Sequence, residues 1–321
     1  MKKFFLALLF FFIFLILTFF VWRRKAPSYE GQDLHSKVSV GESAELILVG
    51  DMGTGGEDQK RLATAMNTYC ESHPLAAIIF LGDNFYPHGV KSIEDPQWES
   101  IFRTPYGLSC LKTVPFYALL GNHDYKGNPA AQVAYHSKSP EWNMPHRFYD
   151  IQFGKLLSLT MLDTNILDIC GFSSYCTLDF LRQSLKTSDS IFKIVLGHHP
   201  IVSSSSKYPR NFQGNLLEGI LCDQAHYYIA GHSHHLEHLT AGNCKTPLDL
   251  FVVGGGGADL YEVKEWQKET RFAQSAFGFM SLKVDAEAMT FAFHDPALKK
   301  LYEVTKRKSE ETQAAEAPPK N

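Results

Sequence analysis

The chain has 321 residues, of which 45% are hydrophobic and 20% are charged. This composition suits one large or two modest globular domains with a sizeable core. The formal net charge of −3 excludes a broadly basic surface, so we expect no nucleic-acid partner. Fourteen histidines are many for this length, and several cluster late in the chain, which is a first indication of metal chemistry.

A long apolar run extends from Phe4 to Trp22, with lysines before it and Arg23, Arg24 and Lys25 after it. At about 1.5 Å per residue, such a helix is long enough to cross a bilayer. We therefore predict that residues 1–25 are an N-terminal membrane anchor, with a long signal peptide as the alternative; no small-residue cleavage site is present. Basic residues at both ends leave the orientation open. We expect an exported protein, either membrane-anchored or secreted/periplasmic.

Residues 26–41 are polar and predict a linker, followed by a catalytic domain over residues 42–304. In that domain, short apolar runs end abruptly in glycine, as strands buried on both faces do. These runs are 46–49, 78–81, 117–120, 193–196 and 227–230. Helical patterns between them, such as 58–72, 95–102 and 178–185, predict an α/β sheet with right-handed crossovers.

Three later apolar runs, 248–253, 279–284 and 289–294, have short connections and predict antiparallel strands of a second sheet. Residues 305–321 are charged and rich in Ala and Pro, which predicts a disordered tail.

The six cysteines lie in the predicted catalytic domain and lack the C-x-x-C spacing, so we expect no metal role for them. An even number allows disulfides in several pairings, of which Cys170 with Cys176 would close a short loop, but buried free thiols fit as well.

Each of the five glycines that end the earlier runs is followed at once by an acid, an amide or a histidine. The motifs are Gly50-Asp51-Met52-Gly53, Gly82-Asp83-Asn84-Phe85-Tyr86, Gly121-Asn122-His123-Asp124, Gly197-His198-His199-Pro200 and Gly231-His232-Ser233-His234. Ligands of α/β sheets lie beyond the carboxyl ends of the strands, so we predict that the motifs converge on one edge. Each motif alone could be a cap or a turn; the ordered set favours a functional site.

The donor atoms in these motifs indicate a class of metal. Carboxylate and amide oxygens together with imidazoles, and no thiolates, suit Fe, Mn or Zn. Two such ions about 3.5–4 Å apart that share one carboxylate form a clamp for in-line displacement at phosphorus. The metals acidify a bound water, which supplies a hydroxide nucleophile without a protein base. The sequence shows no Ser-His-Asp arrangement, P-loop or dinucleotide fingerprint.

In this order the motifs resemble those of the calcineurin-like metallophosphoesterases, and the motif at 82–86 narrows the resemblance to the purple acid phosphatases. Residues 120–128 and the glycine-rich turn at 253–257 are similar to the small, tartrate-resistant type. The resemblance covers roughly residues 45–305. It implies a four-layer α/β/β/α sandwich of two mixed β-sheets flanked by helices. It also implies a monomeric acid phosphatase that hydrolyses phosphate monoesters of small molecules or phosphoproteins.

The resemblance also implies a ligand set. The family pattern assigns to Fe(III) the residues Asp51, Asp83, Tyr86 and His234, and to a second divalent metal (Fe, Zn or Mn) the residues Asp83, Asn122, His198 and His232. Asp83 would bridge the two ions, and the bond between Tyr86 and ferric iron would colour the protein. His123 would be the catalytic residue that contacts the substrate phosphate and helps the leaving group depart, with Asn122 also on the substrate.

Two departures from the small mammalian-type enzymes bear on mechanism. Those enzymes carry a Glu–His pair, linked to proton transfer, in the loop after the histidine–proline motif. Here that loop is Ser203-Ser204-Ser205-Ser206-Lys207, which contains neither residue. The sequence therefore does not identify the general acid. Lys207 would attract phosphate, with a flexible serine loop as the alternative. The segment 168–177 is also shorter than their inhibitory loop, so we expect no activation by proteolytic clipping.

Two other functions remain as alternatives. A phosphodiesterase or nucleotidase of the same superfamily would keep the site, but Tyr86 argues against it because a redox-silent Mn or Zn enzyme needs no phenolate. The other alternative is a membrane-anchored binding protein that has lost catalysis. The complete set of donor residues argues against it.

Overall fold

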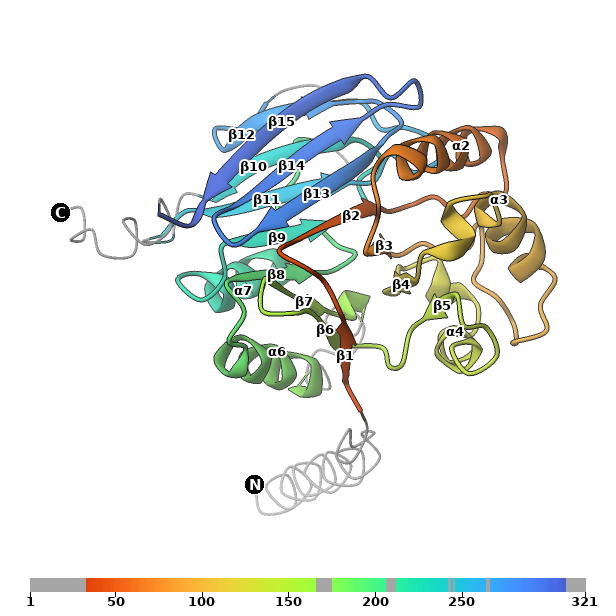
Figure 1. Cartoon of the computed structure of the whole chain (residues 1–321), viewed down its shortest axis with the longest axis horizontal. Helices are drawn as coiled ribbons and strands as arrows, with labels where there is room; N and C mark the ends of the chain where they lie inside the picture. Colours follow the sequence, from red (N-terminus) through yellow and green to blue (C-terminus); the bar gives the residue numbers. More distant parts are fainter. Residues whose placement is uncertain are drawn as a thin grey trace, which may run out of the picture.

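The computed structural model describes residues 33–165, 175–205, 212–241, 244, 246–263 and 266–309. Their strands form two sheets (Figure 1). One sheet has eight strands and the other has seven. The predicted anchor at 1–25, Lys207 and most of the segment 168–177 lie outside the described residues. Among the described helices, none has the length and apolar character needed to cross a membrane.

The seven-stranded sheet combines a parallel half with an antiparallel half. Its order is β15 (Lys300–Arg307), β14 (Ala288–His294), β13 (Phe279–Asp285), β2 (Ser43–Val49), β3 (Ala77–Phe80), β4 (Phe116–Ala118) and β5 (Trp142–Asn143). Strands β2 to β5 run parallel, whereas β13, β14 and β15 add antiparallel neighbours on the other side of β2. The first motif-bearing strands and two of the later runs therefore share one sheet.

The eight-stranded sheet is also mixed. Its order is β1 (His35–Val38), β6 (Tyr149–Phe153), β7 (Leu157–Met161), β8 (Phe192–Leu196), β9 (Tyr227–Ala230), β11 (Leu248–Val253), β10 (Leu236–Ala241) and β12 (Thr270–Gln274). Strands β7, β8, β9 and β11 are parallel to one another. The remaining motif-bearing strands, β8 and β9, are thus in the centre of this second sheet.

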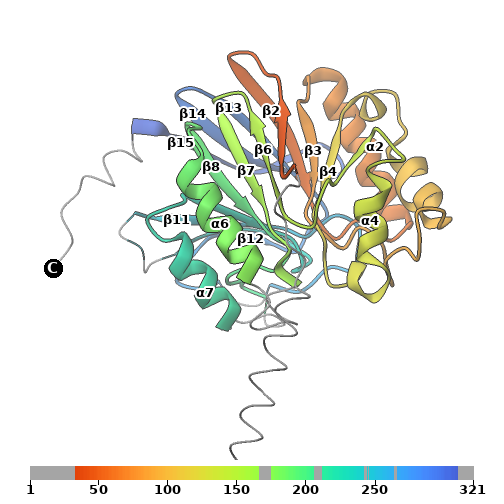
Figure 2. The same cartoon turned by 90° about the horizontal axis from the view of Figure 1, so that it is seen from below.

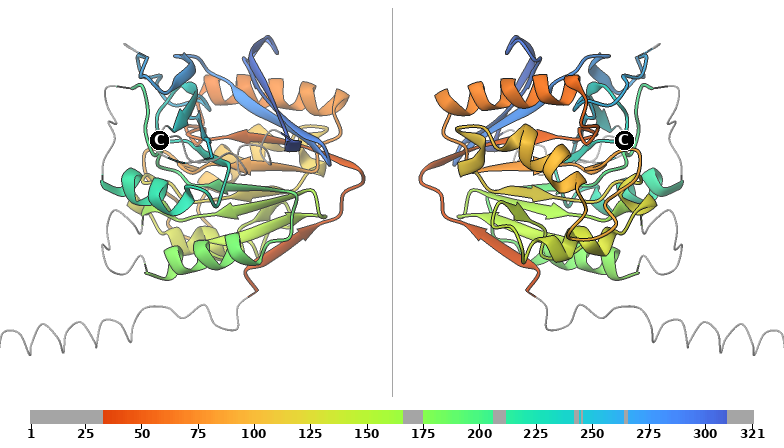
Figure 3. Two further views of the ribbon diagram at one scale, coloured as in Figure 1. Left: turned by 90° about the vertical axis from the view of Figure 1, so that its left-hand side faces the viewer. Right: turned by 90° about the vertical axis from the view of Figure 1, so that its right-hand side faces the viewer.

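Helices cover the outer faces of both sheets. The helical elements are α2 (Glu57–Ser72), the π-helix η1 (Trp98–Arg103), α3 (Thr104–Tyr106), the 3₁₀ turns η2 (Leu111–Thr113) and η3 (Asp124–Lys126), α4 (Pro129–Tyr135), α6 (Tyr175–Thr187) and α7 (Phe212–Leu221). Figure 3 shows α2 outside one sheet and α6 outside the other. In Figure 2, α6 and α7 lie across the eight-stranded sheet, and α4 lies beside β4. The predicted four-layer sandwich is confirmed.

The apolar runs became central strands because both of their faces are covered. Every residue of β3, β9 and β11 is buried, and Leu46 to Val49 of β2 have no exposed surface. The main hydrophobic core fills the space between the sheets and under α2, and a second cluster packs α6 and α7 onto the eight-stranded sheet. Continuous apolar runs are the pattern that such strands require.

Four predictions about elements need correction. The predicted linker contains β1, which pairs with β6; its half-exposed edge position gives only a weak apolar signal. The predicted tail begins inside β15, which ends at Arg307. The run at 248–253 is β11, which is antiparallel to β10 as predicted but also parallel to β9 in the eight-stranded sheet. It does not share a sheet with β13 and β14, which extend the seven-stranded sheet. The helix predicted at 95–102 is the π-helix η1, preceded by turns.

Among the described residues, two disulfides decide between the disulfide and free-thiol alternatives for four cysteines. Cys70 near the end of α2 is bonded to Cys110, and Cys222 just after α7 is bonded to Cys244. The free-thiol interpretation is therefore wrong for these four residues. Cys170, the partner that the sequence suggested for Cys176, lies outside the described residues.

Candidate active site

The five motifs meet where the two sheets approach each other. Three of them follow β2, β3 and β4 of the seven-stranded sheet, and two follow β8 and β9 of the eight-stranded sheet. A backbone hydrogen bond from the Gly50 N–H to the Val253 carbonyl oxygen, 2.8 Å long, connects the sheets at this point. The predicted convergence is correct, but the motifs follow the carboxyl ends of strands in two sheets and not in one.

Three of the predicted ligands have an unusual backbone conformation. Asp51, Asp83 and His232 have φ values of 60°, 54° and 66°, in the left-handed region that costs L-residues about 1–2 kcal/mol each. Hydrogen bonds hold the turns, among them Asp51 N–H to the Gly82 carbonyl at 3.1 Å. Strain of this kind persists where the surrounding structure fixes it, and functional sites are where it clusters.

Glycine is required where the motifs touch. A Cβ on Gly121 would lie 2.2 Å from both the backbone nitrogen and Oδ1 of Asp83, so no other residue fits there. Gly82 has a φ of +88°, and a Cβ on it would lie 2.6 Å from Nδ1 of His198. These glycines allow the third and fourth motifs to approach Asp83 closely.

A first group of donor atoms surrounds the hydroxyl of Tyr86. This oxygen lies 2.8 Å from Oδ2 of Asp83, 3.1 Å from Oδ1 of Asp51 and 3.2 Å from Nε2 of His234. Nδ1 of His234 donates to the carbonyl oxygen of Asp259 at 2.7 Å, so the lone pair of Nε2 faces the group. A single hydroxyl proton cannot serve three acceptors, and a bound cation fits this arrangement.

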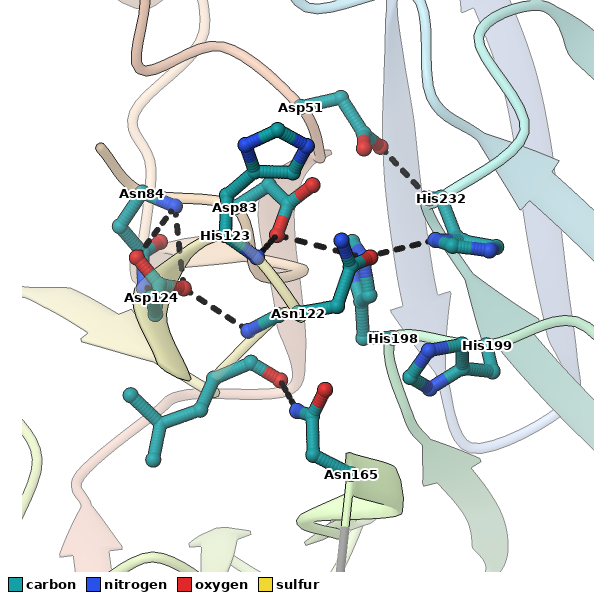
Figure 4. A network of polar contacts seen from close by, with 12 residues as sticks. Asp51, Asp83, Asn84, Asn122, His123, Asp124, Asn165, His198, His199 and His232 are labelled. Atoms are coloured by element: carbon teal, nitrogen blue, oxygen red, sulfur yellow. Dashed lines mark hydrogen bonds and ion pairs between the residues drawn. The ribbon is translucent and has the colours of Figure 1, made fainter. Parts of the chain in front are cut away.

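A second group surrounds Nε2 of His198. This atom lies 3.2 Å from Oδ1 of Asn122, 3.2 Å from Nδ1 of His232 and 3.5 Å from Oδ1 of Asp83. Nδ1 of His198 donates to the carbonyl oxygen of Leu81 at 2.8 Å, which again leaves Nε2 free to act as a ligand. Figure 4 shows Asp83 between Asp51 and His198.

The two groups share one residue. Oδ2 of Asp83 belongs to the first group and Oδ1 to the second. The possible ligand atoms of Asp51, Asp83 and His198 all lie within 4.8 Å of one another. Every residue that the sequence predicted as a metal ligand is therefore in one of two adjacent groups, with Asp83 in both.

The electrostatics of the site also suit cations. Burial opposes ionisation of both Asp83 and His198, but the attraction between them prevails: it lowers the pKa of Asp83 and raises the pKa of His198 to about 9. Burial and the negative charges of Asp51 and Asp83 raise the pKa of Tyr86 far above its usual value. Without a metal ion, Tyr86 therefore stays a protonated phenol. A bound metal cation would instead favour the phenolate.

His123 lies at the border of the first group. Its backbone N–H donates to Oδ1 of Asp83 at 2.7 Å, and its ring is 4.3 Å from the ring of Tyr86. Its side chain is only half-buried, so a substrate can reach it. The predicted role of His123 on the substrate is compatible with this position.

Asp124 is a supporting residue to which sequence reasoning gave no role. Its buried carboxylate accepts hydrogen bonds from the Gly121 N–H at 2.8 Å, the Asn84 N–H at 3.1 Å and Nε2 of Gln132 at 2.9 Å. Burial, and then the charge of Asp83, raise the pKa of Asp124 to about 7. The residue ties the motif after β3 to the motif after β4, and its place within Gly-Asn-His-Asp was the available signal.

His199 is a further imidazole that the sequence analysis left unassigned. Its Nδ1 lies 2.8 Å from Oγ1 of Thr164, and its ring is 4.5 Å from that of His232. One nitrogen from each of His198, His199 and His232 can lie within 4.8 Å of the others. Burial, and then the charge of His198, lower the pKa of His199 to about 3, so it is a neutral ring beside the second group.

The serine loop is ordered by a buried Glu–His pair. Both carboxylate oxygens of Glu237 accept a hydrogen bond from the Ser204 N–H, at 3.0 and 3.1 Å, and Nε2 of His235 lies 2.9 Å from Oε2 of Glu237. Ser203 is hydrogen-bonded to Ser233 inside the last motif. The flexible-loop interpretation is therefore wrong for residues 203–205, which are buried. Lys207, the predicted phosphate-attracting residue, lies outside the described residues.

Comparisons with known proteins identify the family of this chain. Residues 44–236 match the calcineurin-like phosphoesterase family. Purple acid phosphatase 4 of Arabidopsis thaliana is 28% identical over 277 residues, which cover 79% of this chain and 80% of the relative. Tartrate-resistant acid phosphatase type 5 of Homo sapiens is 28% identical over 256 residues, which cover 70% of this chain and 77% of the relative.

Solved structures show the same fold. A purple acid phosphatase from seeds of yellow lupin (Lupinus luteus) superposes with a TM-score of 0.70 at 16% identity, covering 88% of this chain and 57% of that one. GAP50, described as the anchor in the inner membrane complex of Plasmodium, superposes with a TM-score of 0.74 at 20% identity, covering 85% of this chain and 94% of that one. With its matching motifs on this fold, the chain belongs to the calcineurin-like phosphoesterase family, and the curated relatives described above are acid phosphatases.

Proposed function

We propose that this protein is a binuclear-metal acid phosphatase that hydrolyses phosphate monoesters. The observation that carries the proposal is the division of Asp83, whose two carboxylate oxygens face two separate groups of donor atoms. The names of the relatives, which are acid phosphatases of the purple and tartrate-resistant types, support the same activity.

Each group of donors would hold one ion. Asp51, Asp83, Tyr86 and His234 would bind Fe(III), because three oxygen ligands with a phenolate suit a hard, highly charged ion. Asp83, Asn122, His198 and His232 would bind a divalent ion such as Fe, Zn or Mn. When bound, the pair supplies an acidified water as the nucleophile and neutralises charge on the phosphate.

The residues of the chain have complementary tasks. The hydrogen bonds from His198 to Leu81 and from His234 to Asp259 hold each imidazole with Nε2 toward its group. Such preorganisation keeps the ligands in place during the reaction. His123, held by its N–H bond to Asp83, would contact the substrate phosphate and assist the leaving group. Asn122 would bind one ion and the substrate.

The test of this proposal is a comparison of two substrates. The full-length protein, solubilised in detergent and supplied with iron and zinc, is assayed with an aryl phosphate monoester and with the corresponding diester across pH 4 to 8. We expect the monoester to be the preferred substrate and the rate to be highest in the acidic range. Preference for the diester would support the phosphodiesterase alternative, and no turnover of either would contradict the proposal.

We also propose that residues 1–25 attach the protein to a membrane. The apolar run between Lys3 and Arg23 would insert by burial, which screening of charges does not reverse. Detergent, but not high salt, should release the full-length protein from membranes. Recovery of a soluble form that begins near residue 26 would show a cleaved signal peptide instead.

A further inference from the structure

A lysine lies directly beside His123 and has no role in the function proposed above. Lys126 is the last residue of the 3₁₀ turn η3, and His123 is the residue that precedes this turn. Side chains three residues apart eclipse each other in a 3₁₀ turn. The Lys126 ammonium accordingly lies 3.2 Å from Nε2 and 3.3 Å from Nδ1 of His123.

The hydrogen bonds of the imidazole determine which nitrogen the lysine contacts as a donor. Nδ1 of His123 lies 2.8 Å from the carbonyl oxygen of Pro87. A carbonyl oxygen only accepts, so Nδ1 carries the proton and Nε2 accepts from the Lys126 ammonium. An ammonium has three N–H groups, and the others remain for further acceptors. Lys126 is exposed, so these groups face a space that a substrate can enter.

The position of Lys126 relative to the site is therefore defined by a chain of contacts. The Tyr86 hydroxyl lies within the first donor group, the His123 ring lies against the Tyr86 ring, and the Lys126 ammonium lies beside the His123 ring. The lysine extends the outer wall formed by His123. If His123 contacts the phosphate that is hydrolysed, the ammonium is one step further along the substrate, next to the leaving group.

We propose that Lys126 is a specificity-determining residue whose ammonium binds a leaving group that carries negative charge close to the scissile bond. This inference rests on the proposed phosphatase function. The matching substrates are compounds in which the leaving group is itself a phosphate, because its charge begins one bond beyond the scissile oxygen. The carboxylates of an acidic phosphopeptide lie many bonds away and match the short distance between His123 and Lys126 less well.

The reaction on such a substrate balances as ordinary hydrolysis. The oxygen of water forms a bond to the terminal phosphorus, and the bond from this phosphorus to the bridging oxygen breaks. The leaving phosphate keeps the bridging oxygen with its electron pair and gains negative charge, while the protons of water are shared between the two phosphates. The Lys126 ammonium would stabilise that developing charge as a charge-assisted hydrogen-bond donor.

The experiment compares inorganic pyrophosphate with phenyl phosphate on the metal-loaded, full-length protein and on Lys126→Met. Because the lysine is exposed, its contribution is moderate: we expect kcat/KM for pyrophosphate to fall about threefold to fivefold, and that for phenyl phosphate by less than twofold. The pyrophosphate effect should shrink as salt rises, since screening weakens exposed charge pairs. Lys126→Arg should retain the preference.

A binding measurement separates recognition from turnover. By calorimetry, Lys126→Met should lose affinity for methylenediphosphonate but much less for methylphosphonate, at unchanged metal content. The matched control is Lys155→Met, which removes an exposed lysine from the turn before β7, at the opposite ends of the parallel strands. This variant should leave the affinity for both ligands unchanged.

Two outcomes would overturn the inference while the phosphatase proposal stands. One is an unaltered ratio between pyrophosphate and phenyl phosphate in Lys126→Met, with both hydrolysed by the wild type. The other is a loss of kcat/KM in Lys126→Met that is confined to an acidic phosphopeptide assayed in parallel. If the wild type hydrolyses none of these compounds, the proposed function itself fails.

Discussion

At the scale of single residues, the identity of the candidate ligands could be predicted from the sequence, whereas their arrangement could not. The motifs named Asp51, Asp83 and His232, but nothing in the residue types shows that these three have left-handed backbone conformations. The division of Asp83 between two donor groups likewise depends on the turns after several strands. Asp124 and His199 were missed because a buried carboxylate and a second histidine in a motif have many structural uses.

Tyr86 provides the most specific test at this scale. Tyr86→Phe removes only the hydroxyl, while the ring can still pack beside His123. In the iron-loaded protein, the variant should lose its visible absorption band, because the colour requires a phenolate bound to ferric iron. Phosphatase activity should fall by less than about tenfold, since the phenol supplies neither nucleophile nor bridge. Absorption spectra and monoester turnover check this, and a wild type that is colourless yet fully active with zinc or manganese would contradict it.

His294 predicts a pH-dependent stability unrelated to catalysis. Burial, and then the positive charges of Lys300 and His73, lower the pKa of this ring to about 4, with Glu303 and Asp295 acting in the opposite direction. Its Nε2 is hydrogen-bonded to Ser281 at 2.9 Å. The folded state therefore favours the neutral ring, whereas the unfolded chain takes up a proton near the ordinary histidine pKa of about 6.5.

Stability from this group is complete above pH 6.5 and is lost as the pH falls toward 4. The free energy of unfolding should decrease with a slope below about 1.4 kcal/mol per pH unit in that interval. In His294→Gln, which cannot be protonated, the decrease should be shallower. Urea unfolding at pH 7.5, 6, 5 and 4.5 compares the two proteins, and parallel curves would show that His294 does not contribute.

At the scale of elements, the apolar runs predicted the strands, but the sheet to which each belongs depended on distant pairing. The apolar run at 248–253 would suit a strand of either sheet, and only its pairing with β9 and β10 places it in the eight-stranded sheet. β1 was missed because an edge strand with one exposed face has no continuous apolar run. The order of the serine loop was missed because its partner, Glu237, is more than thirty residues away in sequence.

Glu237 is the residue that joins two of these elements. It projects from β10 and accepts hydrogen bonds from the serine loop and from His235. Glu237→Ala would leave the Ser204 N–H and His235 buried without this acceptor, so we expect a loss of about 2–4 kcal/mol in the free energy of unfolding. Glu287→Ala, at an exposed turn, is the control and should change stability by less than about 0.5 kcal/mol. Equal midpoints of thermal unfolding for the two variants would refute a joining role.

At the scale of the whole molecule, two sheets together place five strand ends around Asp83. The resemblance to known families predicted the four layers, and the structure confirmed them. The sequence could not show that β2, β3 and β4 approach β8 and β9 from a different sheet. Nor could it choose disulfide pairs, because Cys70 and Cys110 are brought together only by the packing of α2 against the segment that includes η2.

The most direct test of the central claim is the metal content of the purified protein and of variants in one donor group. Asn122 and His198 belong only to the second group, whereas Asp51, Tyr86 and His234 complete the first. Elemental analysis should find about two metal ions per wild-type chain and about one, mainly iron, in Asn122→Ala and in His198→Ala. A single ion in the wild type, or equal loss of both ions in each variant, would contradict a pair of ions that share Asp83.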